Sequence, residues 1–104
     1  MERIAFKMKL KSGNEKEYKK RHDEIWPELS KAIKDAGIKE YSIFLDEETL
    51  TLFAFHKLEK NNSLQKLAQL ACMKTWWDFM ADIMEVNPDN SPVVHDLKEV
   101  FFQA

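Results

Sequence analysis

A chain of 104 residues with 44% hydrophobic and 12% aromatic residues has the size and composition of one globular domain, so we expect a single domain over residues 1–104. Sixteen basic and eighteen acidic residues give a net charge of -2, which argues against a nucleic-acid-binding protein because no positive field is available for a phosphate backbone. The lone Cys72 excludes a disulfide within the chain and a zinc site built from several cysteines.

The first predicted element is a β-strand over residues 3–10. Its apolar side chains alternate with charged or small ones, the period-two pattern of a strand with one solvated face: Ile4, Phe6, Met8 and Leu10. The same alternation lacks the continuous apolar run of a signal peptide or a membrane span. We therefore expect a cytoplasmic protein that has no membrane contact.

The second predicted element is a helix that begins after Asn14 and ends at Gly37. Asn14 and Glu17 have the spacing of a capping box. Pro27 has no N–H to donate inside a helix, so we expect a kink or a restart there. The basic cluster of residues 16–21 is interleaved with glutamates and predicts a solvated helix face rather than a binding patch.

One face of this helix carries titratable side chains among core residues. Steps of three and four along the chain connect the members of this stripe: Tyr18, His22, Ile25, Leu29, Ala32 and Ala36. Tyr18 and His22 are one turn apart and therefore point the same way. Two interpretations stay open: His22 and Tyr18 line a pocket in which the imidazole exchanges protons near neutral pH, or they are a hydrogen-bonded core histidine and a half-buried tyrosine.

Residues 38–45 and 50–58 alternate in the same period-two manner, and the turn-forming residues 46–49 between them predict a hairpin. Tyr41 shares one face of the first strand with Ile43 and Leu45. His56 alternates with apolar residues in the second strand, so it either faces the pocket or is a polar cross-strand neighbour. The sequence favours the structural role.

A helical region is predicted over residues 64–84, with a possible break near residues 69–72, and a fourth strand over residues 97–102. Trp76 and Trp77 supply flat apolar surfaces with an N–H at the edge. Such surfaces suit a sugar ring, which has apolar C–H faces and polar rims. The alternative is core packing, which the sequence favours for at least one of the pair.

The predicted order of strand, helix, strand, strand, helix, strand is the split βαβ arrangement of a ferredoxin-like α+β fold. Four strands then form one antiparallel sheet that has both helices on one face. The other face would be open and would carry large side chains. Because a chain of this length hides little surface by itself, we expect a homodimer that pairs two such faces.

The residue inventory limits the chemistry. With two glycines in the chain, neither a dinucleotide fingerprint nor a phosphate-cradling loop can be written. The three histidines show no metal-binding spacing, and no Ser, Cys or Thr lies in a nucleophile motif. General acid–base chemistry by His, Tyr, Asp or Glu is the simplest remaining catalytic option.

The sequence resembles the L-rhamnose mutarotase family nearly from end to end. The matching segments are Tyr18 with residues 21–29 (RHDEIWPEL), the strand with Tyr41, the pair Trp76 and Trp77, and residues 87–93 (NPDNSPV). The resemblance implies a dimeric α/β-barrel protein that interconverts the α and β anomers of L-rhamnose, or of a similar unphosphorylated sugar, without a cofactor. By position it implies that His22 is the proton donor and that Tyr18, Tyr41, Trp76 and Trp77 contact the sugar. His56 and His95 match no motif and receive no role.

That chemistry needs little from the protein. One group takes the proton of the anomeric hydroxyl, another protonates the ring oxygen, the C1–C2 bond turns, and the reverse steps close the other anomer. General acid–base assistance is worth roughly 10²–10⁴ in rate, so one imidazole with a phenol or water is enough. Two other hypotheses use the same scaffold: a non-catalytic ligand-binding module, and a cofactor-independent monooxygenase or haem-handling protein that has His22 as ligand.

Overall fold

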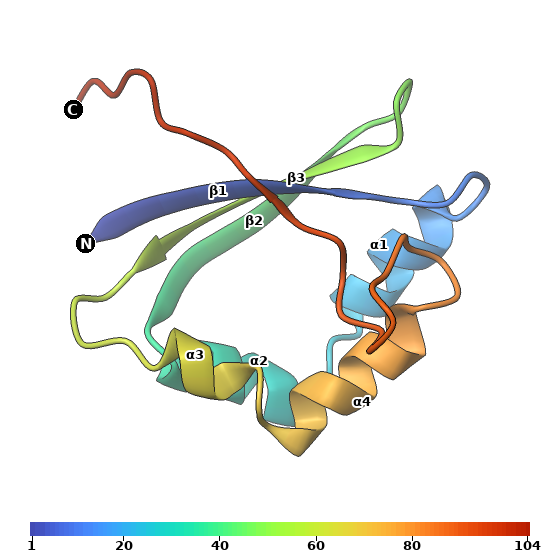
Figure 1. Cartoon of the computed structure of the whole chain (residues 1–104), viewed down its shortest axis with the longest axis horizontal. Helices are drawn as coiled ribbons and strands as arrows, with labels where there is room; N and C mark the ends of the chain where they lie inside the picture. Colours follow the sequence, from blue (N-terminus) through green and yellow to red (C-terminus); the bar gives the residue numbers. More distant parts are fainter.

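The chain folds as one antiparallel sheet with helices on one face (Figure 1). The computed structural model describes every residue, Met1–Ala104. Its elements are β1 (Glu2–Lys9), α1 (Glu15–Asp23), α2 (Pro27–Asp35), β2 (Ile38–Asp46), β3 (Thr51–Leu58), α3 (Leu64–Leu67), α4 (Ala71–Met80) and β4 (His95–Asp96). The strands lie in the order β2-β3-β1-β4, and each pairs antiparallel with its neighbour. The ferredoxin-like α+β arrangement expected from the sequence is confirmed.

The core lies between the sheet and the helix layer. β1 and β3 pair without interruption from Glu2 opposite Leu58 to Lys9 opposite Thr51, so their inner side chains stand in one row. The main cluster of buried residues comprises Met8, Leu10, Tyr18, Leu29, Leu52, Ala54, Trp76, Met80, Ile83 and Met84. The first strand, the helical stripe and the third strand therefore bury the faces that their periodicity indicated.

A β-bulge in β2 changes which side chains face the helices. The register with β3 shifts after Lys39, so that Glu40 and Tyr41 both lie opposite one residue, His56. Strict alternation would leave Ile38 and Tyr41 on opposite faces of the sheet, because side chains alternate with period two. The extra residue lets both face inward. Glu40 adopts a φ of 50°, a conformation that marks the irregular backbone of the bulge.

The restart expected at Pro27 is confirmed. α1 ends at Asp23, Trp26 occupies the N-cap position of α2, and Pro27 takes the first helical position, where a missing N–H has no consequence. Gly37, at a φ of 93°, follows the end of α2. The two halves of the predicted stripe thus lie on two helices that meet at a bend.

The predicted capping box is wrong. The side chain of Asn14 makes no capping bond to α1. Its amide instead donates to the carbonyl oxygens of Lys11 (3.2 Å) and Ser12 (3.1 Å), because the preceding turn presents these acceptors at close range.

The second helical region breaks at residues 68–70, which confirms the break expected near residues 69–72, but α4 ends at Met80 rather than at residue 84. Beyond α4 the backbone pairs with the end of β1: the N–H of Lys11 donates to the carbonyl of Ile83 (2.9 Å), and that of Glu85 donates to the carbonyl of Lys9 (3.1 Å). These long-range bonds replace the helical ones. No helix in the chain has both the length and the apolar character needed to cross a membrane.

The prediction of a strand over residues 97–102 is wrong, because β4 comprises only His95–Asp96. The following tail crosses β1 and then leaves the sheet (Figure 1). Side-chain contacts replace ladder bonds here: Arg3 donates twice to the carboxylate of Glu99, at 2.9 and 2.8 Å, and its guanidinium lies 3.5 Å from the ring centroid of Phe102. The apolar residues Val100, Phe101 and Phe102 of the tail are exposed.

Candidate active site

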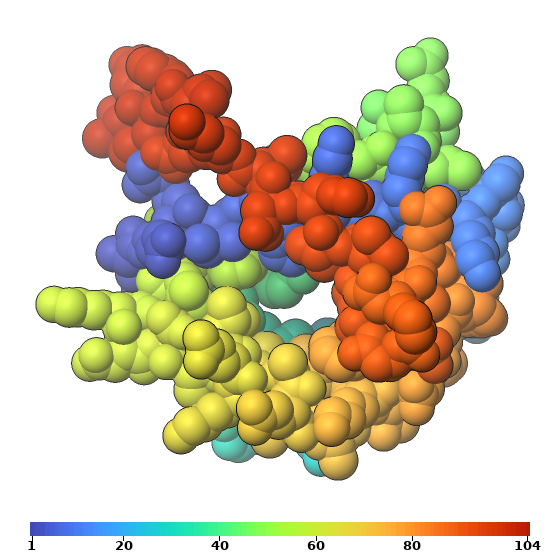
Figure 2. Space-filling model, in the orientation of Figure 1, coloured from blue at the N-terminus to red at the C-terminus, as the bar shows by residue number.

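A cavity of about 1140 Å³ lies between the inner face of the sheet and the helices. Figure 2 shows its hollow among β1, α3 and the segment that follows α4. Hydrophobic side chains make up 22 of the 33 lining residues, so the polar groups among the other eleven orient what the cavity binds.

The cavity brings together all the residues that the sequence placed at a site. Tyr18 and His22 come from α1, Tyr41 from β2, and Trp76 and Trp77 from α4. They are far apart in the chain, and the sheet and the two helices place them around one space.

The other two histidines differ from each other. His56, from β3, also lines the cavity, whereas His95 is exposed on β4 and does not. The structural role that the sequence favoured for His56 left this position out of the predicted site. The sequence signal that could have included His56 in the site is its position in the apolar alternation of β3.

The imidazole of His22 is arranged as a base. Its Nδ1 lies 3.1 Å from the carbonyl oxygen of Tyr18, and because a carbonyl only accepts, this bond assigns the hydrogen to Nδ1. Nε2 then carries a lone pair and has no partner within the chain. Burial lowers the pKa of His22 below 6.5, against the opposing effects of the Tyr18 bond and the charge of Asp23. The neutral form therefore prevails at neutral pH.

One phenol, that of Tyr18, lies beside this imidazole, and another, that of Tyr41, lies on the sheet in β2. The ring of Tyr18 stacks on that of His22, with 4.3 Å between centroids. Burial raises the pKa of Tyr18 well above its usual range and that of Tyr41 to about 12. Tyr41 as a whole keeps 40% of its surface exposed. Both phenols therefore stay protonated and can donate hydrogen bonds.

The two neighbouring tryptophans have different surroundings. Trp76 is 8% exposed, and its ring meets those of His22 (5.4 Å) and Trp26 (5.0 Å) edge to face. Trp77 is half-buried and packs at the margin of the core cluster. Both border the cavity, but Trp76 contributes more to the core.

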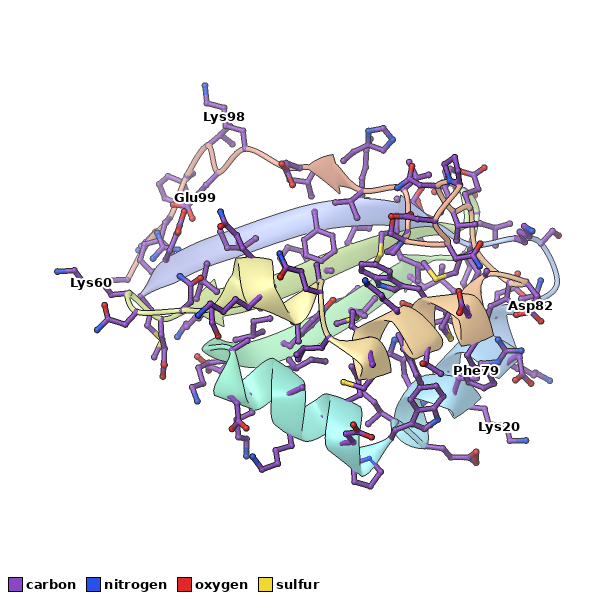
Figure 3. All side chains as sticks on the ribbon, turned by 60° about the horizontal axis from the view of Figure 1, so that its bottom comes forward. Lys20, Lys60, Phe79, Asp82, Lys98 and Glu99 are labelled. Carbon is purple, nitrogen blue, oxygen red and sulfur yellow. The ribbon has the colours of Figure 1, made fainter.

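Arg21 fixes α1 against α4 beside the cavity. Its side chain, 12% exposed, donates to the carboxylates of Glu17 (2.7 Å) and Asp82 (2.8 Å) and to the carbonyl oxygen of Phe79 (2.7 Å). Phe79 and Asp82 are labelled at this end of α4 in Figure 3. The solvated face predicted for the basic cluster is therefore wrong for Arg21, which orients the helix that carries His22.

Fold and cavity together define a class: a small ferredoxin-like α+β protein whose apolar cavity is edged by imidazole, phenol and indole groups. Such a lining suits a compact ligand that has C–H faces and hydroxyl edges. No group of three or more His, Cys, Asp or Glu side chains is placed to hold a metal ion.

Comparison with known proteins identifies the family. The family model described as L-rhamnose mutarotase matches residues 3–103, and the chain belongs to this family. An L-rhamnose mutarotase from Formosa agariphila is 61% identical over 102 residues, with 98% of each chain covered. One from Listeria monocytogenes is 54% identical over the full length of both chains.

Solved structures agree with the fold. The crystal structure of an L-rhamnose mutarotase from Formosa agariphila is 58% identical and superposes with a TM-score of 0.93, covering all of both chains. A conserved protein from Methanosarcina mazei has a TM-score of 0.62 at 13% identity, covering 93% of this chain and 90% of that one. At that identity the likeness concerns the fold alone.

Proposed function

We propose that this protein is an isomerase that interconverts the α and β anomers of L-rhamnose by general acid–base ring opening and closure. The observation that carries the proposal is the imidazole of His22, which lines an apolar cavity beside a protonated phenol and whose Nε2 has no partner in the chain. Membership of the L-rhamnose mutarotase family supports the sugar. It also favours this activity over a non-catalytic binding module or a monooxygenase.

In the opening half-reaction, Nε2 of neutral His22 takes the proton of the anomeric hydroxyl. The C1–O5 bond breaks, its electron pair goes to O5, and O5 takes a proton from a phenol or a water molecule while C1 becomes an aldehyde. After rotation about C1–C2, the hydroxyl on C5 attacks the other face of C1 and returns its proton. The imidazolium of His22 then donates its proton to O1, which is the donor role that the resemblance implied.

The remaining expected residues bind the sugar in this proposal. The phenols of Tyr18 and Tyr41 donate hydrogen bonds to hydroxyls or to the ring oxygen. The indoles of Trp76 and Trp77 pack against C–H faces and against the methyl group of the 6-deoxy sugar. No nucleophile, cofactor or metal enters the scheme.

Exchange spectroscopy by NMR tests the proposal directly. Saturating the resonance of one anomer of L-rhamnose should reduce the signal of the other far more with protein than in buffer. L-Mannose, which differs from L-rhamnose by a hydroxyl on C6, is a matched substrate and should exchange less well. If no sugar exchanged faster than in buffer, a binding module would be the better hypothesis.

We further propose a homodimer formed by the outer face of the sheet. Phe44 and Phe55 are 62% and 42% exposed on this face, and their rings pack edge to face with 6.0 Å between centroids. An exposed aromatic pair of this kind favours a covering partner. The cytoplasmic location expected from the sequence stays a prediction.

A further inference from the structure

His56 occupies an unusual place on the inner face of β3. Its inward-facing neighbours on the strand are all apolar and buried: Leu52, Ala54 and Leu58. His56 itself is 6% exposed and, apart from Tyr18, is the one buried residue with a titratable side chain. Its ring lies 5.4 Å from that of Tyr41 and 6.1 Å from that of Phe6.

The imidazole has an unused hydrogen-bonding atom. Nδ1 is 3.4 Å from the carbonyl oxygen of Lys57, a long contact that favours the tautomer with the hydrogen on Nδ1, and Nε2 has no partner in the chain. No polar atom of a buried side chain is both sealed from solvent and unpaired, so Nε2 meets open space, and the space beside His56 is the cavity. Nε2 is therefore free to accept a hydrogen bond from a ligand hydroxyl in the cavity, in place of a water molecule.

The strand beside His56 has an irregular backbone at this position. The bulge in β2 places two residues, Glu40 and Tyr41, opposite His56 alone. Bulges beside sites re-aim side chains, and here the bulge turns Tyr41 inward next to the imidazole. The result is an acceptor and a donor side by side on the sheet, where they suit a sugar that carries adjacent hydroxyls.

We propose that Nε2 of His56 accepts a hydrogen bond from a ring hydroxyl of the sugar, which makes His56 a substrate-binding residue on the sheet side of the cavity. The inference rests on the proposed function. It gives the cavity two polar walls: His22 and Tyr18 on α1 perform or assist proton transfer, while His56 and Tyr41 hold the part of the ring that does not react. Burial lowers the pKa of His56, which keeps the imidazole neutral and its acceptor atom free.

Two variants of His56 separate binding from packing. His56→Val removes the acceptor but keeps an apolar, β-branched side chain that suits the strand. It should raise KM and the dissociation constant for L-rhamnose about 3- to 10-fold, the range for one hydrogen bond between neutral groups, with little change in kcat and no loss of thermal stability. His56→Gln keeps an acceptor oxygen and should show a smaller rise. His95→Ala, on an exposed histidine outside the cavity, is the control and should change none of these values.

The hydroxyl that His56 binds can be found with L-rhamnose analogues lacking the hydroxyl on C2, C3 or C4. One analogue should bind more weakly than L-rhamnose to the wild type, yet His56→Val should discriminate little against it, because their shared hydrogen bond is already lost. Unchanged affinity in His56→Val would overturn the inference. So would equal further losses on all three analogues, since that pattern would mean that His56 acts only by packing on Tyr41.

Dissociation constants from tryptophan fluorescence keep this test separate from the activity. If the wild type bound L-rhamnose without accelerating anomer exchange, the proposed function would fail while the His56 measurements kept their meaning. If the wild type accelerated exchange and His56→Val matched it in KM and affinity, only the inference about His56 would fail.

Discussion

At the scale of single residues, surroundings distinguish the three histidines of this chain. His22 and His56 both line the cavity, and each places Nδ1 near a backbone carbonyl and leaves Nε2 without a partner, whereas His95 lies exposed on β4. Burial lowers the pKa of both cavity histidines, because the charged form loses its hydration there. Only His22 stacks on a protonated phenol, which makes it the better candidate for proton transfer.

Replacing His22 by Ala should lower enzyme-catalysed anomer exchange by roughly 10²–10⁴, the usual contribution of a positioned acid–base group. The fold should persist, because His22 is half-buried and lies outside the Leu and Ile positions of the core. Saturation-transfer NMR on L-rhamnose and a thermal melt measure the two quantities. Exchange at the wild-type rate in this variant would exclude His22 as the acid–base group.

The pH profile should follow the neutral form of His22. Burial, the largest influence, lowers its pKa below the ordinary 6.5, so the base is present at neutral pH and is lost as the pH falls. We expect kcat/KM, corrected for exchange in buffer, to be level near pH 7 and to fall below pH 6.5. The profile of His56→Gln should keep this inflection. A rise of kcat/KM on acidification would contradict a neutral His22 as the starting state.

Trp76 and Trp77 should respond differently to replacement by Leu. Trp76 packs against His22, Trp26 and Phe79, so its loss should lower the free energy of unfolding by an amount approaching the ~3–5 kcal/mol for truncation of large core aromatics. Trp77→Leu should keep the fold but weaken rhamnose binding, because a branched aliphatic side chain lacks the flat ring surface. Melts and fluorescence titrations test both. Unchanged rhamnose affinity in both variants would remove the indoles from the sugar site.

At the scale of elements, patterns local in the sequence explain the predictions that were confirmed, and long-range contacts explain the elements that end elsewhere. The period-two and period-3.6 patterns located β1, β2, β3 and the helices, and Pro27 located the bend between α1 and α2. The predicted elements that end elsewhere are those with long-range contacts: α4 ends early because Ile83 and Glu85 form backbone bonds with residues 9–11, and the side chain of Arg3 binds the tail at Glu99.

Gly37 shows how tightly one junction between elements is built. Its φ is 93°, and a Cβ at this position would lie 3.1 Å from Cβ of Asn62. Gly37→Ala should therefore lose about 1–2 kcal/mol from the left-handed backbone and roughly 1 kcal/mol or more from the contact. Gly13 is the control, since its φ is 85° but a Cβ there would meet nothing within 4 Å. Urea denaturation should rank Gly37→Ala below Gly13→Ala, and equal losses would mean that the contact relaxes freely.

At the scale of the whole molecule, the sheet has one face closed by helices and one face with exposed aromatic side chains. The first encloses the cavity and the second carries Phe44 and Phe55. A small domain buries a modest fraction of its surface by itself. The homodimer proposed above would cover the second face and leave the helices outside.

Phe44→Glu should weaken this dimer, because it places a charge in the middle of a desolvated apolar contact. Leu70→Glu is the matched control: Leu70 is 42% exposed but belongs to the helix layer. Sedimentation velocity at micromolar concentration should give a dimer for the wild type and for Leu70→Glu. Phe44→Glu should give a monomer or a rapid equilibrium between monomer and dimer. A monomeric wild type would contradict the dimer.

The sequence by itself determined whatever depends on neighbours along the chain. Alternation and helical spacing specified the strands, the helices and their buried faces, and the four-residue step from Tyr18 to His22 placed a phenol on an imidazole. The resemblance to the family named five residues that the structure places around one cavity.

Only the tertiary structure decided the features that join distant segments. The bulge that puts Tyr41 opposite His56 follows from the register of β2 on β3, and the hold of Arg21 on α4 needs two helices to meet. The contact of the tail after β4 with Arg3 of β1 likewise joins distant segments. None of these leaves a periodic signal, because each results from competition among hydrogen-bond partners that become neighbours only after folding.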